Sequence, residues 1–251
     1  MNAITINTNK FLKLIFRKFG YEIVWYDPRL NPQMRRKKLL ESYGINVVLD
    51  VGANAGQFGK NLRNIGYKGR IISFEPVSSA FKELHLNSKG DSSWKIHNFA
   101  LGSEEEESFI NISENSLSSS LLEILPSHIK FAPDSKYIGK EKIKIKTINS
   151  IFPLLCAKDD NIYLKIDTQG FEENVIIGAL DSIQFIDTLE LEMSLIPLYM
   201  KELLFNEMCI FLNHLGYTMV SIEPDFTDEV TGQLLQVVGI FHRFSLKPKK
   251  H

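Results

Sequence analysis

The sequence predicts an α/β fold in which a mostly parallel sheet is covered by helices on both faces and finishes with an antiparallel strand. Three observations indicate this class. Apolar runs alternate with helix-like segments, the first apolar run ends in a glycine turn, and a short polar connection joins the last two apolar runs. With 251 residues and 44% hydrophobic content, the chain can bury one substantial core. We expect one domain at 46–243, a basic helical arm at 1–45 and a basic tail at 244–251.

The first strand and its turn carry the strongest local signal, in the stretch VVLDVGANAG from Val47 to Gly56. The β-branched run 47–51 is typical of a strand buried on both faces, and Gly52 and Gly56 bracket a turn where the backbone can approach a ligand closely. The helix expected at 57–66 would direct its free N–H groups and the positive end of its dipole at an anionic group.

The second strand, expected at 70–75, ends in an acid that suits a nucleoside. Glu75 and Pro76 occupy the place where many nucleotide-binding folds hold ribose hydroxyls with a carboxylate. The glycine spacing is G-x-x-x-G instead of G-x-G-x-x-G, which disfavours NAD and favours S-adenosylmethionine (SAM). SAM would present its carboxylate to the turn amides, its ribose to Glu75 and its ammonium group to an acid such as Asp50.

The remaining elements continue the alternation. We expect helices at 77–88, 173–180 and 199–214, and strands at 94–99, 161–167, 186–193, 217–223 and 234–243. The last two strands are joined by a polar stretch containing Asp225, Asp228 and Gly232, which favours a hairpin over a crossover helix.

One stretch, from Leu101 to Asn149, interrupts this alternation and is expected to lie beside the cleft. Its acidic run at 104–107 is interpreted as a solvated turn between two short strands, and its serine cluster at 116–120 as a helix cap ahead of Leu121. An alternating KIKIKT segment follows later in this insert.

Composition excludes several classes. Cys156 and Cys209 are too few for a disulfide framework and have no zinc-ligand spacing, so we expect inert core thiols in a reducing cytoplasm. No apolar run approaches the roughly 20 residues of a membrane-spanning helix, and the N-terminus lacks the pattern of a signal peptide. We therefore expect a cytoplasmic protein without membrane insertion.

The N-terminal arm is strongly basic. The segment from Lys10 to Lys38 contains nine Lys or Arg residues and only two acids, Glu22 and Asp27, so its net charge is +7. Apolar residues fall near helical spacing between these charges, so the arm can contact an anionic membrane at its inner face, or a lipid-linked glycan. We favour a solvated helix whose apolar stripe packs on the main domain. No nucleic-acid partner is predicted, because a basic run without a known module is a poor signal.

Seven motifs together resemble one family. In order along the chain they are VLDVGANAGQF, ISFEP, NFALG, NSLSSSL, LKIDTQGFE, LELEMSLIPLY and TGQLLQVVGIF. Over the stretch from Asn46 to Arg243 the chain resembles the FkbM family of SAM-dependent methyltransferases. The resemblance implies a class I methyltransferase (Rossmann-like) fold and O-methylation of a sugar or glycan hydroxyl, in a surface polysaccharide, glycolipid or natural-product glycoside.

The resemblance also implies which residues hold the cofactor. The methionine end of SAM would meet Asp50, Gly52, Ala53, Asn54, Gly56 and Phe58, the ribose Glu75 and Pro76, and the adenine Asn98, Ala100 and Leu101. Asn98 has an alternative role as a turn former at a strand exit. The turn after NFALG departs from the family, since Ser103 and four glutamates stand where similar proteins have a glycine, which puts the local hairpin geometry in doubt.

Methyl transfer to an unactivated hydroxyl benefits from a general base. Asp167 lies at the carboxyl end of the strand 161–167, with Lys165 on the same face and Glu172 on the turn that follows. Glu190 and Glu192 share one face of a later strand, where they can line a cleft, pair with Lys165 or bind a metal. We predict Asp167 as base or substrate anchor, supported by Glu172, Glu192 and Lys165.

Several alternatives stay open. Asp167 can instead cap the turn DTQG, and His128 in the insert is a base candidate ranked below the acids. Asp167 and Glu192 can hold Mg²⁺, but without a third clear ligand no metal is predicted. Besides the methyltransferase, we consider an NAD-dependent sugar-modifying Rossmann enzyme and a SAM-binding scaffold domain without catalysis.

Overall fold

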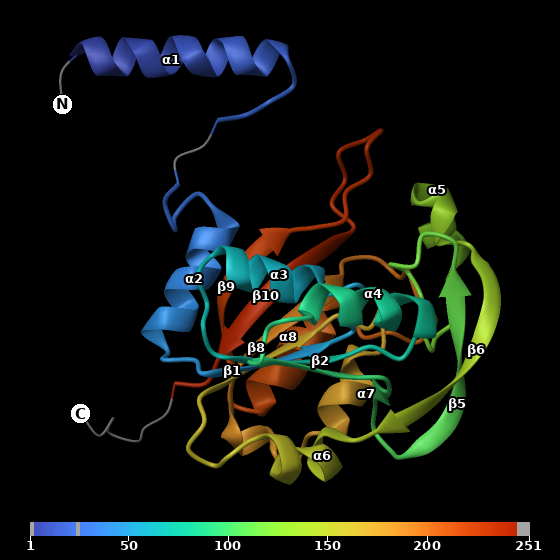
Figure 1. The fold of residues 1–251 in the computed structure, drawn as a ribbon. Helices are drawn as coiled ribbons and strands as arrows, with labels where there is room; N and C mark the ends of the chain where they lie inside the picture. The colour runs from blue at the N-terminus through green and yellow to red at the C-terminus, as the bar shows by residue number, and fades with distance from the viewer. Residues whose placement is uncertain (1–2, 24–25, 245–251) are drawn as a thin grey trace. The chain divides into compact units, whose positions relative to one another are not determined.

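The computed structural model describes residues 3–23 and 26–244 and forms two compact units, Met1–Ser42 and Tyr43–His251. The first unit contains helices α1 (Ala3–Lys18) and α2 (Pro32–Ser42), drawn in blue in Figure 1. No helix in the described part of the chain has the length and apolar character needed to cross a bilayer. Beyond residue 244, the predicted basic tail lies outside the described residues.

A seven-stranded sheet forms the centre of the second unit (Figure 1), with strand order β3-β2-β1-β7-β8-β10-β9. Every neighbouring pair from β3 to β8 is parallel, and β10 is antiparallel to both β8 and β9. The strands are β1 (Val47–Val51), β2 (Arg70–Phe74), β3 (Trp94–His97), β7 (Ile162–Ile166), β8 (Ile186–Ser194), β9 (Thr218–Pro224) and β10 (Gln236–His242). The predicted mostly parallel sheet and its closing antiparallel hairpin are confirmed.

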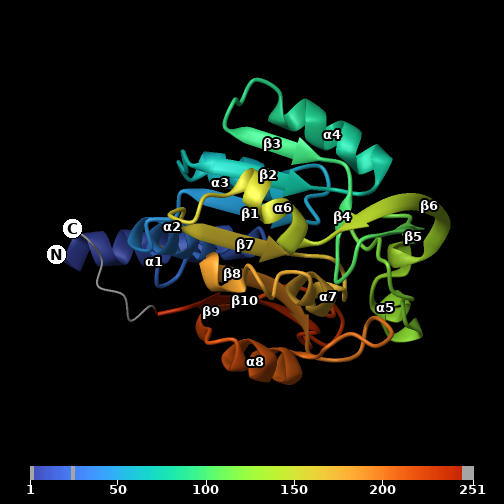
Figure 2. The same cartoon turned by 90° about the horizontal axis from the view of Figure 1, so that it is seen from below.

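Helices cover both faces of this sheet, as Figures 1 and 2 show together. On one face lie α3 (Gln57–Asn64) and α4 (Ser78–Ser88), and on the other α6 (Ile148–Leu155), α7 (Glu172–Ile177) and α8 (Phe205–His214). The connections after β1 and β7 therefore run to opposite faces, which opens a crevice at the carboxyl ends of these neighbouring strands.

The packing of the core explains why the sequences of the central strands are nearly continuous apolar runs. All five residues of β1 and all five of β7 are buried, because helices cover the sheet on both sides. One face packs Leu49, Leu164 and Leu189 into a large cluster with apolar side chains of the helices. The carboxyl ends of these strands are thus held by a rigid support.

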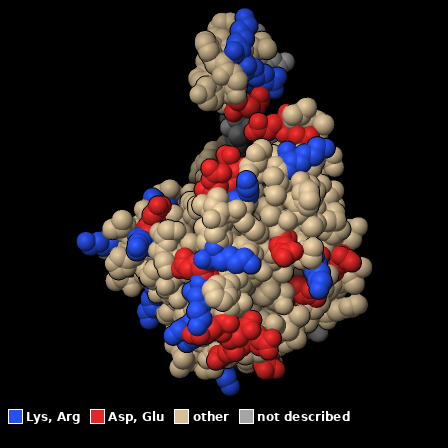
Figure 3. Space-filling view, turned by 90° about the vertical axis from the view of Figure 1, so that its right-hand side faces the viewer, with Lys and Arg blue, Asp and Glu red and all other residues tan. Residues whose placement is uncertain are grey.

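The insert forms a second, three-stranded sheet of order β4-β6-β5, seen at the right of Figure 1. Its elements are β4 (Ala100–Leu101), β5 (Glu106–Ser113), helix α5 (Pro126–Phe131), a 3₁₀ turn η1 (Pro133–Ser135) and β6 (Tyr137–Lys146). The KIKIKT alternation is β6, which buries Ile143 and Ile145 on one face. Positive and negative side chains are mixed on this side of the molecule (Figure 3), as in the ion pair of Lys142 with Glu107 at 2.5 Å.

The structure corrects four predicted elements. The strand expected at 94–99 ends at His97, and Ala100 begins a strand of the second sheet. The acidic run is not only a turn, since Glu106 and Glu107 open β5. The serine cluster caps no helix, because the backbone of Asn111 pairs with that of Ser120 instead.

The last correction concerns the helix expected at 199–214, which begins only at Phe205. The backbone N–H groups of Leu198 and Tyr199 donate to the Glu202 carboxylate, at 2.5 and 2.8 Å, and this closes a turn ahead of the helix. A second 3₁₀ turn, η2 (Ile183–Phe185), and helix α6 were not expected. Helix α6 starts where the Thr147 hydroxyl accepts the Ser150 N–H at 3.1 Å.

Candidate functional site

Two adjoining cavities open at the carboxyl ends of β1, β2, β7 and β8, with volumes of about 260 and 450 Å³. We call them the first and the second cavity. Both are lined by Gly52, Asn54, Leu117, Asp167 and Glu192, so these residues form their common boundary. The first cavity is otherwise mainly apolar and includes Phe74, Glu75, Pro76, Ala100, Leu101 and Phe171. The second also includes Ala53, Gln57, Phe58, Asn61, Lys165, Glu190 and Asp225.

The turn after β1 brings the backbone against the end of β7. Gly52 has φ +72°, and a Cβ added there would lie 1.8 Å from the backbone oxygen of Asp167. Only glycine fits, because any other residue would collide with main chain that cannot move independently. Gly56 also has a positive φ, but an added Cβ there would meet Leu84 and Trp94, so its role is packing behind the site.

Asn54 joins this turn to the end of β2 and to the insert. It has φ +46°, and its backbone N–H donates to Glu75 Oε2 at 2.8 Å. Its side-chain Nδ2 donates to the backbone oxygen of Ser116 at 3.1 Å. The serine-rich loop therefore forms a wall of the site, which places the insert beside the cleft as expected.

Glu75 is a buried acid whose two oxygens each accept one backbone N–H, from Asn54 and from Val77 at 2.8 Å. Burial raises its pKa to about 7, and the two N–H groups only partly offset this. A carboxylate offers about four acceptor positions. Glu75 therefore retains the capacity to accept hydroxyl groups in the first cavity.

Asp50 lies beneath the cavities and lines neither of them. It is fully buried, accepts the Ser73 hydroxyl at 2.9 Å and lies 3.3 Å from the Lys165 ammonium. Trp94 in turn donates its indole N–H to Ser73 at 3.0 Å. This corrects the predicted contact of Asp50 with the ammonium group of SAM: the carboxylate is committed to an ion pair inside the sheet.

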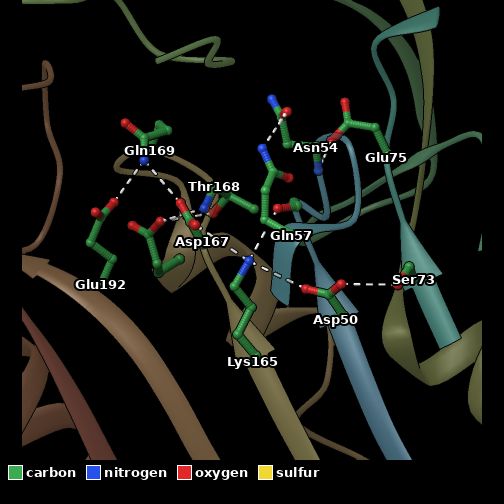
Figure 4. Close-up of polar contacts among 12 residues, drawn as sticks. Asp50, Asn54, Gln57, Ser73, Glu75, Lys165, Asp167, Thr168, Gln169 and Glu192 are labelled. Atoms are coloured by element: carbon green, nitrogen blue, oxygen red, sulfur yellow. Dashed lines mark hydrogen bonds and ion pairs between the residues drawn. The ribbon is translucent and has the colours of Figure 1, made fainter. Parts of the chain in front are cut away.

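Lys165 links this buried pair to the site. Its Nζ lies 3.3 Å from Asp50 Oδ1 and 3.3 Å from Asp167 Oδ2, and it donates to the backbone oxygen of Gly52 at 3.1 Å (Figure 4). Burial alone would lower the Lys165 pKa, but the charges of Asp167 and Asp50 outweigh it and the pKa is raised. Lys165 thus stays a cation and lies 5.6 Å from the Phe58 ring centre.

Asp167 and Glu192 meet at the boundary of the cavities, held by one amide. Gln169 Nε2 donates to Asp167 Oδ1 at 2.9 Å and to Glu192 Oε2 at 2.7 Å (Figure 4). Burial, followed by the charge of Asp167 and contact with Asp225, raises the Glu192 pKa well above its usual range. The predicted pair of acids is therefore brought together, with side chains that line both cavities.

Glu172 does not join this pair. Its Oε1 accepts the Thr168 N–H at 2.8 Å, the Thr168 hydroxyl at 3.0 Å and the Gly170 N–H at 3.3 Å, and it lines neither cavity. Burial raises its pKa to about 7. The predicted catalytic support is corrected to a structural one, because the carboxyl group stabilises the loop between β7 and α7.

Replacing Glu172 with glutamine is expected to change the pH dependence of stability. With a folded pKa of about 7 against a usual 4.5, the folded wild type binds more protons between these values, so its stability falls as pH rises through that window. The amide oxygen of glutamine can still accept hydrogen bonds from Thr168 and Gly170, but it does not ionise, so its contribution to stability does not fall with rising pH. The variant should therefore gain on the order of 2 kcal/mol relative to wild type from pH 4.5 to 8, measured by urea unfolding. Glu173→Gln, on the same turn of α7, serves as control; a parallel pH dependence of wild type and Glu172→Gln would contradict this role.

Three further candidates are Asn98 and His128, which line neither cavity, and Glu190, which lines the second cavity. Asn98 donates its side-chain N–H to the backbone oxygens of Glu75 and Pro76, at 2.9 and 3.0 Å, so it fixes the turn after β2 and lines neither cavity. His128 is buried in α5 against Tyr199, and burial lowers its pKa to about 4. The position of His128 removes it as a base, whereas the adenine contact of Asn98 stays a prediction. Glu190 lines the second cavity and accepts the Tyr163 hydroxyl, and it lies opposite Lys165 in the register of β7 and β8.

Several site residues were not predicted. The second cavity is lined by Gln57, Asn61 and Asp225, and Leu117 borders both cavities. The motif NSLSSSL carried the signal for Leu117, and TQGFE the signal for Gln169. Nothing in the local pattern marked Asp225, which approaches only because β9 returns beside β10. Among the described residues, no cluster of three or more His, Cys, Asp or Glu is arranged to hold a metal ion.

Comparison with known proteins identifies one family. The model of the methyltransferase FkbM domain matches residues 50–219. The FkbM methyltransferase structure from Methylobacillus flagellatus is 13% identical, with a TM-score of 0.46, over 78% of this chain and 43% of that chain. This chain thus spans less than half of that structure's length. No match is found among curated proteins.

Two further solved structures are also similar. The precorrin-6y C5,15-methyltransferase of Geobacter metallireducens is 11% identical, with a TM-score of 0.42, over 84% of this chain and 88% of that chain. A Streptococcus pneumoniae tRNA (m1A22) methyltransferase candidate in complex with S-adenosyl-L-methionine is 12% identical, with a TM-score of 0.44, over 86% and 75%. At TM-scores below 0.5, these likenesses decide neither ligand nor substrate.

Proposed function

Because this chain belongs to the FkbM methyltransferase family, we propose that it transfers a methyl group from SAM to a hydroxyl of a sugar or glycan. Acceptors of this kind occur in surface polysaccharides, glycolipids and natural-product glycosides. The observation that carries the proposal is the boundary of the two cavities, where a nucleoside-sized space and a polar space meet at Asp167 and Glu192.

The residues of the first cavity fit the nucleoside part of SAM. Glu75 offers carboxylate positions to the ribose hydroxyls, and Pro76, Ala100, Leu101 and Phe171 offer an apolar wall to the adenine. The N–H groups of the turn from Gly52 to Gly56 are bonded within the protein, but the N-terminus of α3 lies at the second cavity, where its dipole suits a carboxylate. SAM, when bound, supplies a methyl group activated by its sulfonium charge.

The second cavity fits a polyhydroxylated acceptor. Gln57 and Asn61 on α3 each carry an amide that can both donate to and accept from a hydroxyl group, and Leu117 and Phe58 add apolar surface. Asp167 lies at the cavity boundary, where it can accept the proton of the reacting hydroxyl. Lys165, a cation 3.3 Å away, balances the charge of Asp167. Holding the hydroxyl in line with the methyl group is the main contribution, and the base adds roughly 10²–10⁴-fold.

Binding of S-adenosylhomocysteine near pH 7 is expected to release a fraction of a proton. Ribose hydroxyls donating to Glu75 favour its charged form, so the pKa of about 7 in the free protein falls when the ligand binds. Affinity should therefore increase as pH rises from 6 to 8. Calorimetry in buffers of different ionisation enthalpy measures this release. Glu75→Gln should bind about 10- to 100-fold more weakly and without the pH dependence; an unchanged pH dependence in this variant would place the ribose elsewhere.

Turnover is tested by supplying SAM with candidate glycans and sugar nucleotides and searching for a product heavier by one methyl group. The proposal expects such a product and binding of S-adenosylhomocysteine. Quenching of nicotinamide fluorescence, without stabilisation by S-adenosylhomocysteine, would instead support the NAD-dependent enzyme. Binding without any methylated product over a broad acceptor panel would support a scaffold domain.

A further inference from the structure

The loop after β7 contains an uncommon backbone conformation. Gln169 has φ +57°, in the left-handed region, and Gly170 follows with φ +94°. A residue with a side chain adopts this conformation at a cost on the order of 1 kcal/mol, and glycine would avoid that cost. The contacts of the Gln169 side chain must therefore offset this conformational cost.

Every polar atom of the Gln169 amide has a partner. Nε2 donates to Asp167 and Glu192, at 2.9 and 2.7 Å, and Oε1 accepts the Tyr199 hydroxyl at 2.7 Å. The backbone oxygen of Gln169 also accepts the Ser120 hydroxyl at 2.7 Å. Through its amide Gln169 is therefore connected to the end of β7, to β8 and to the segment after β8, and through its backbone oxygen to the insert.

Tyr199 contacts the oxygen end of the amide. The residue is 1% exposed, and its hydroxyl donates to Gln169 Oε1 at 2.7 Å. Nε2 faces the two acids on the other side, and its two hydrogens satisfy one oxygen of each. A neutral amide can hold two carboxyl groups side by side without adding a charge of its own.

We propose that Gln169 is a positioning residue: its amide holds Asp167 and Glu192 side by side at the boundary of the two cavities. The catalytic consequence rests on the proposed function, because these carboxyl groups would face the reacting hydroxyl there. The spacing of the two acids itself is a property of the protein without any ligand.

The test follows the titration of Glu192, by ¹³C NMR of side-chain carboxyl groups assigned with Glu192→Gln. Glu192 is faced by Asp167 at the end of β7, Asp225 after β9 and Glu172 on α7, while Lys165 pairs with Asp167. In Gln169→Leu an apolar group replaces the donated N–H, so the Glu192 pKa should rise further. In Gln169→Gly water can enter and the acids can separate, so the pKa should fall towards its usual value.

Two controls distinguish a local change at Glu192 from a loss of folding and from a general effect of replacing glutamine with leucine. Gln169→Gly removes the left-handed cost, so it should remain folded with a melting temperature near that of wild type. Gln184→Leu replaces an exposed glutamine before the opposite end of β8 and should leave the Glu192 titration unchanged. A Glu192 titration that does not rise in Gln169→Leu would overturn the proposal. Failure of wild type to bind S-adenosylhomocysteine would instead overturn the proposed function and leave this test intact.

The catalytic consequence has its own measurement once a methylated product is found. Gln169→Leu and Gln169→Gly should each lower kcat by about 100-fold, the effect expected when reacting groups shift by about 1 Å. The rate is compared at saturating SAM, because Gln169 also lines the first cavity and its replacement can change the KM for SAM. An unchanged kcat in both variants would show that the spacing of the acids does not serve the reaction.

Discussion

Replacing Asp167 with asparagine is expected to lower kcat by roughly 10²–10⁴-fold while leaving the affinity for S-adenosylhomocysteine within a fewfold of wild type. The asparagine side chain keeps the shape of the aspartate, and its oxygen can still accept the Gln169 N–H. It cannot take up the proton of the acceptor hydroxyl. Because Lys165 keeps its contacts with Asp50 and Gly52, the ion pair below the site survives.

The measurement is the rate of methyl transfer to the acceptor found by mass spectrometry, together with calorimetric titration. Asp159→Asn is the matched control, because Asp159 is exposed in the turn before β7, at the opposite end of the same strand. It should leave both rate and affinity unchanged. Full activity of Asp167→Asn would remove Asp167 as the base and move that role to Glu192.

Replacing Lys165 with methionine is expected to destabilise the protein by about 3–5 kcal/mol. Asp50 is fully buried, and Lys165 is the cation 3.3 Å from its Oδ1. Methionine fills a similar volume but leaves the Asp50 charge buried and uncompensated. The free energy of unfolding in urea, measured at pH 7.5, reports this loss.

A double variant separates the charge from the packing. In Lys165→Met with Asp50→Asn no charge is left unpaired at the buried pair, and the amide oxygen can still accept the Ser73 hydroxyl. We expect this variant to recover most of the lost stability, since a buried ion pair replaced as a unit is often nearly neutral. A loss below about 1 kcal/mol in the single variant would mean that Asp50 and Lys165 do not form a charged pair.

The order of elements was largely predictable from sequence, because local patterns decide it. Alternating apolar runs and glycine turns located every strand of the central sheet, and the polar connection at 224–232 marked the antiparallel hairpin. The elements predicted wrongly lie where hydrogen bonds between residues apart in the chain decide the structure instead of the local pattern. The backbone of Ser120 pairs with Asn111, and Glu202 closes the turn that delays helix α8.

The site was predictable only as a region. Strand-end positions placed Asp167, Glu192 and Glu75 at one edge of the sheet, because parallel strands end together. The pattern does not state which carboxyl group faces the cavity. Glu172 turns into its own loop, and Asp50 turns into the sheet, although both lie within two residues of a strand end or a turn.

By itself, the sequence determined the fold class, the glycine at position 52 and the presence of acids at the strand ends, since these follow from local periodicity and spacing. Only the tertiary structure decided how the acids pair. The strand register sets Ser73, Asp50 and Lys165 in one row across β2, β1 and β7. A loop residue, Gln169, then bridges two neighbouring strands. Register and loop contacts depend on residues far apart in the chain, and therefore no local pattern encodes them.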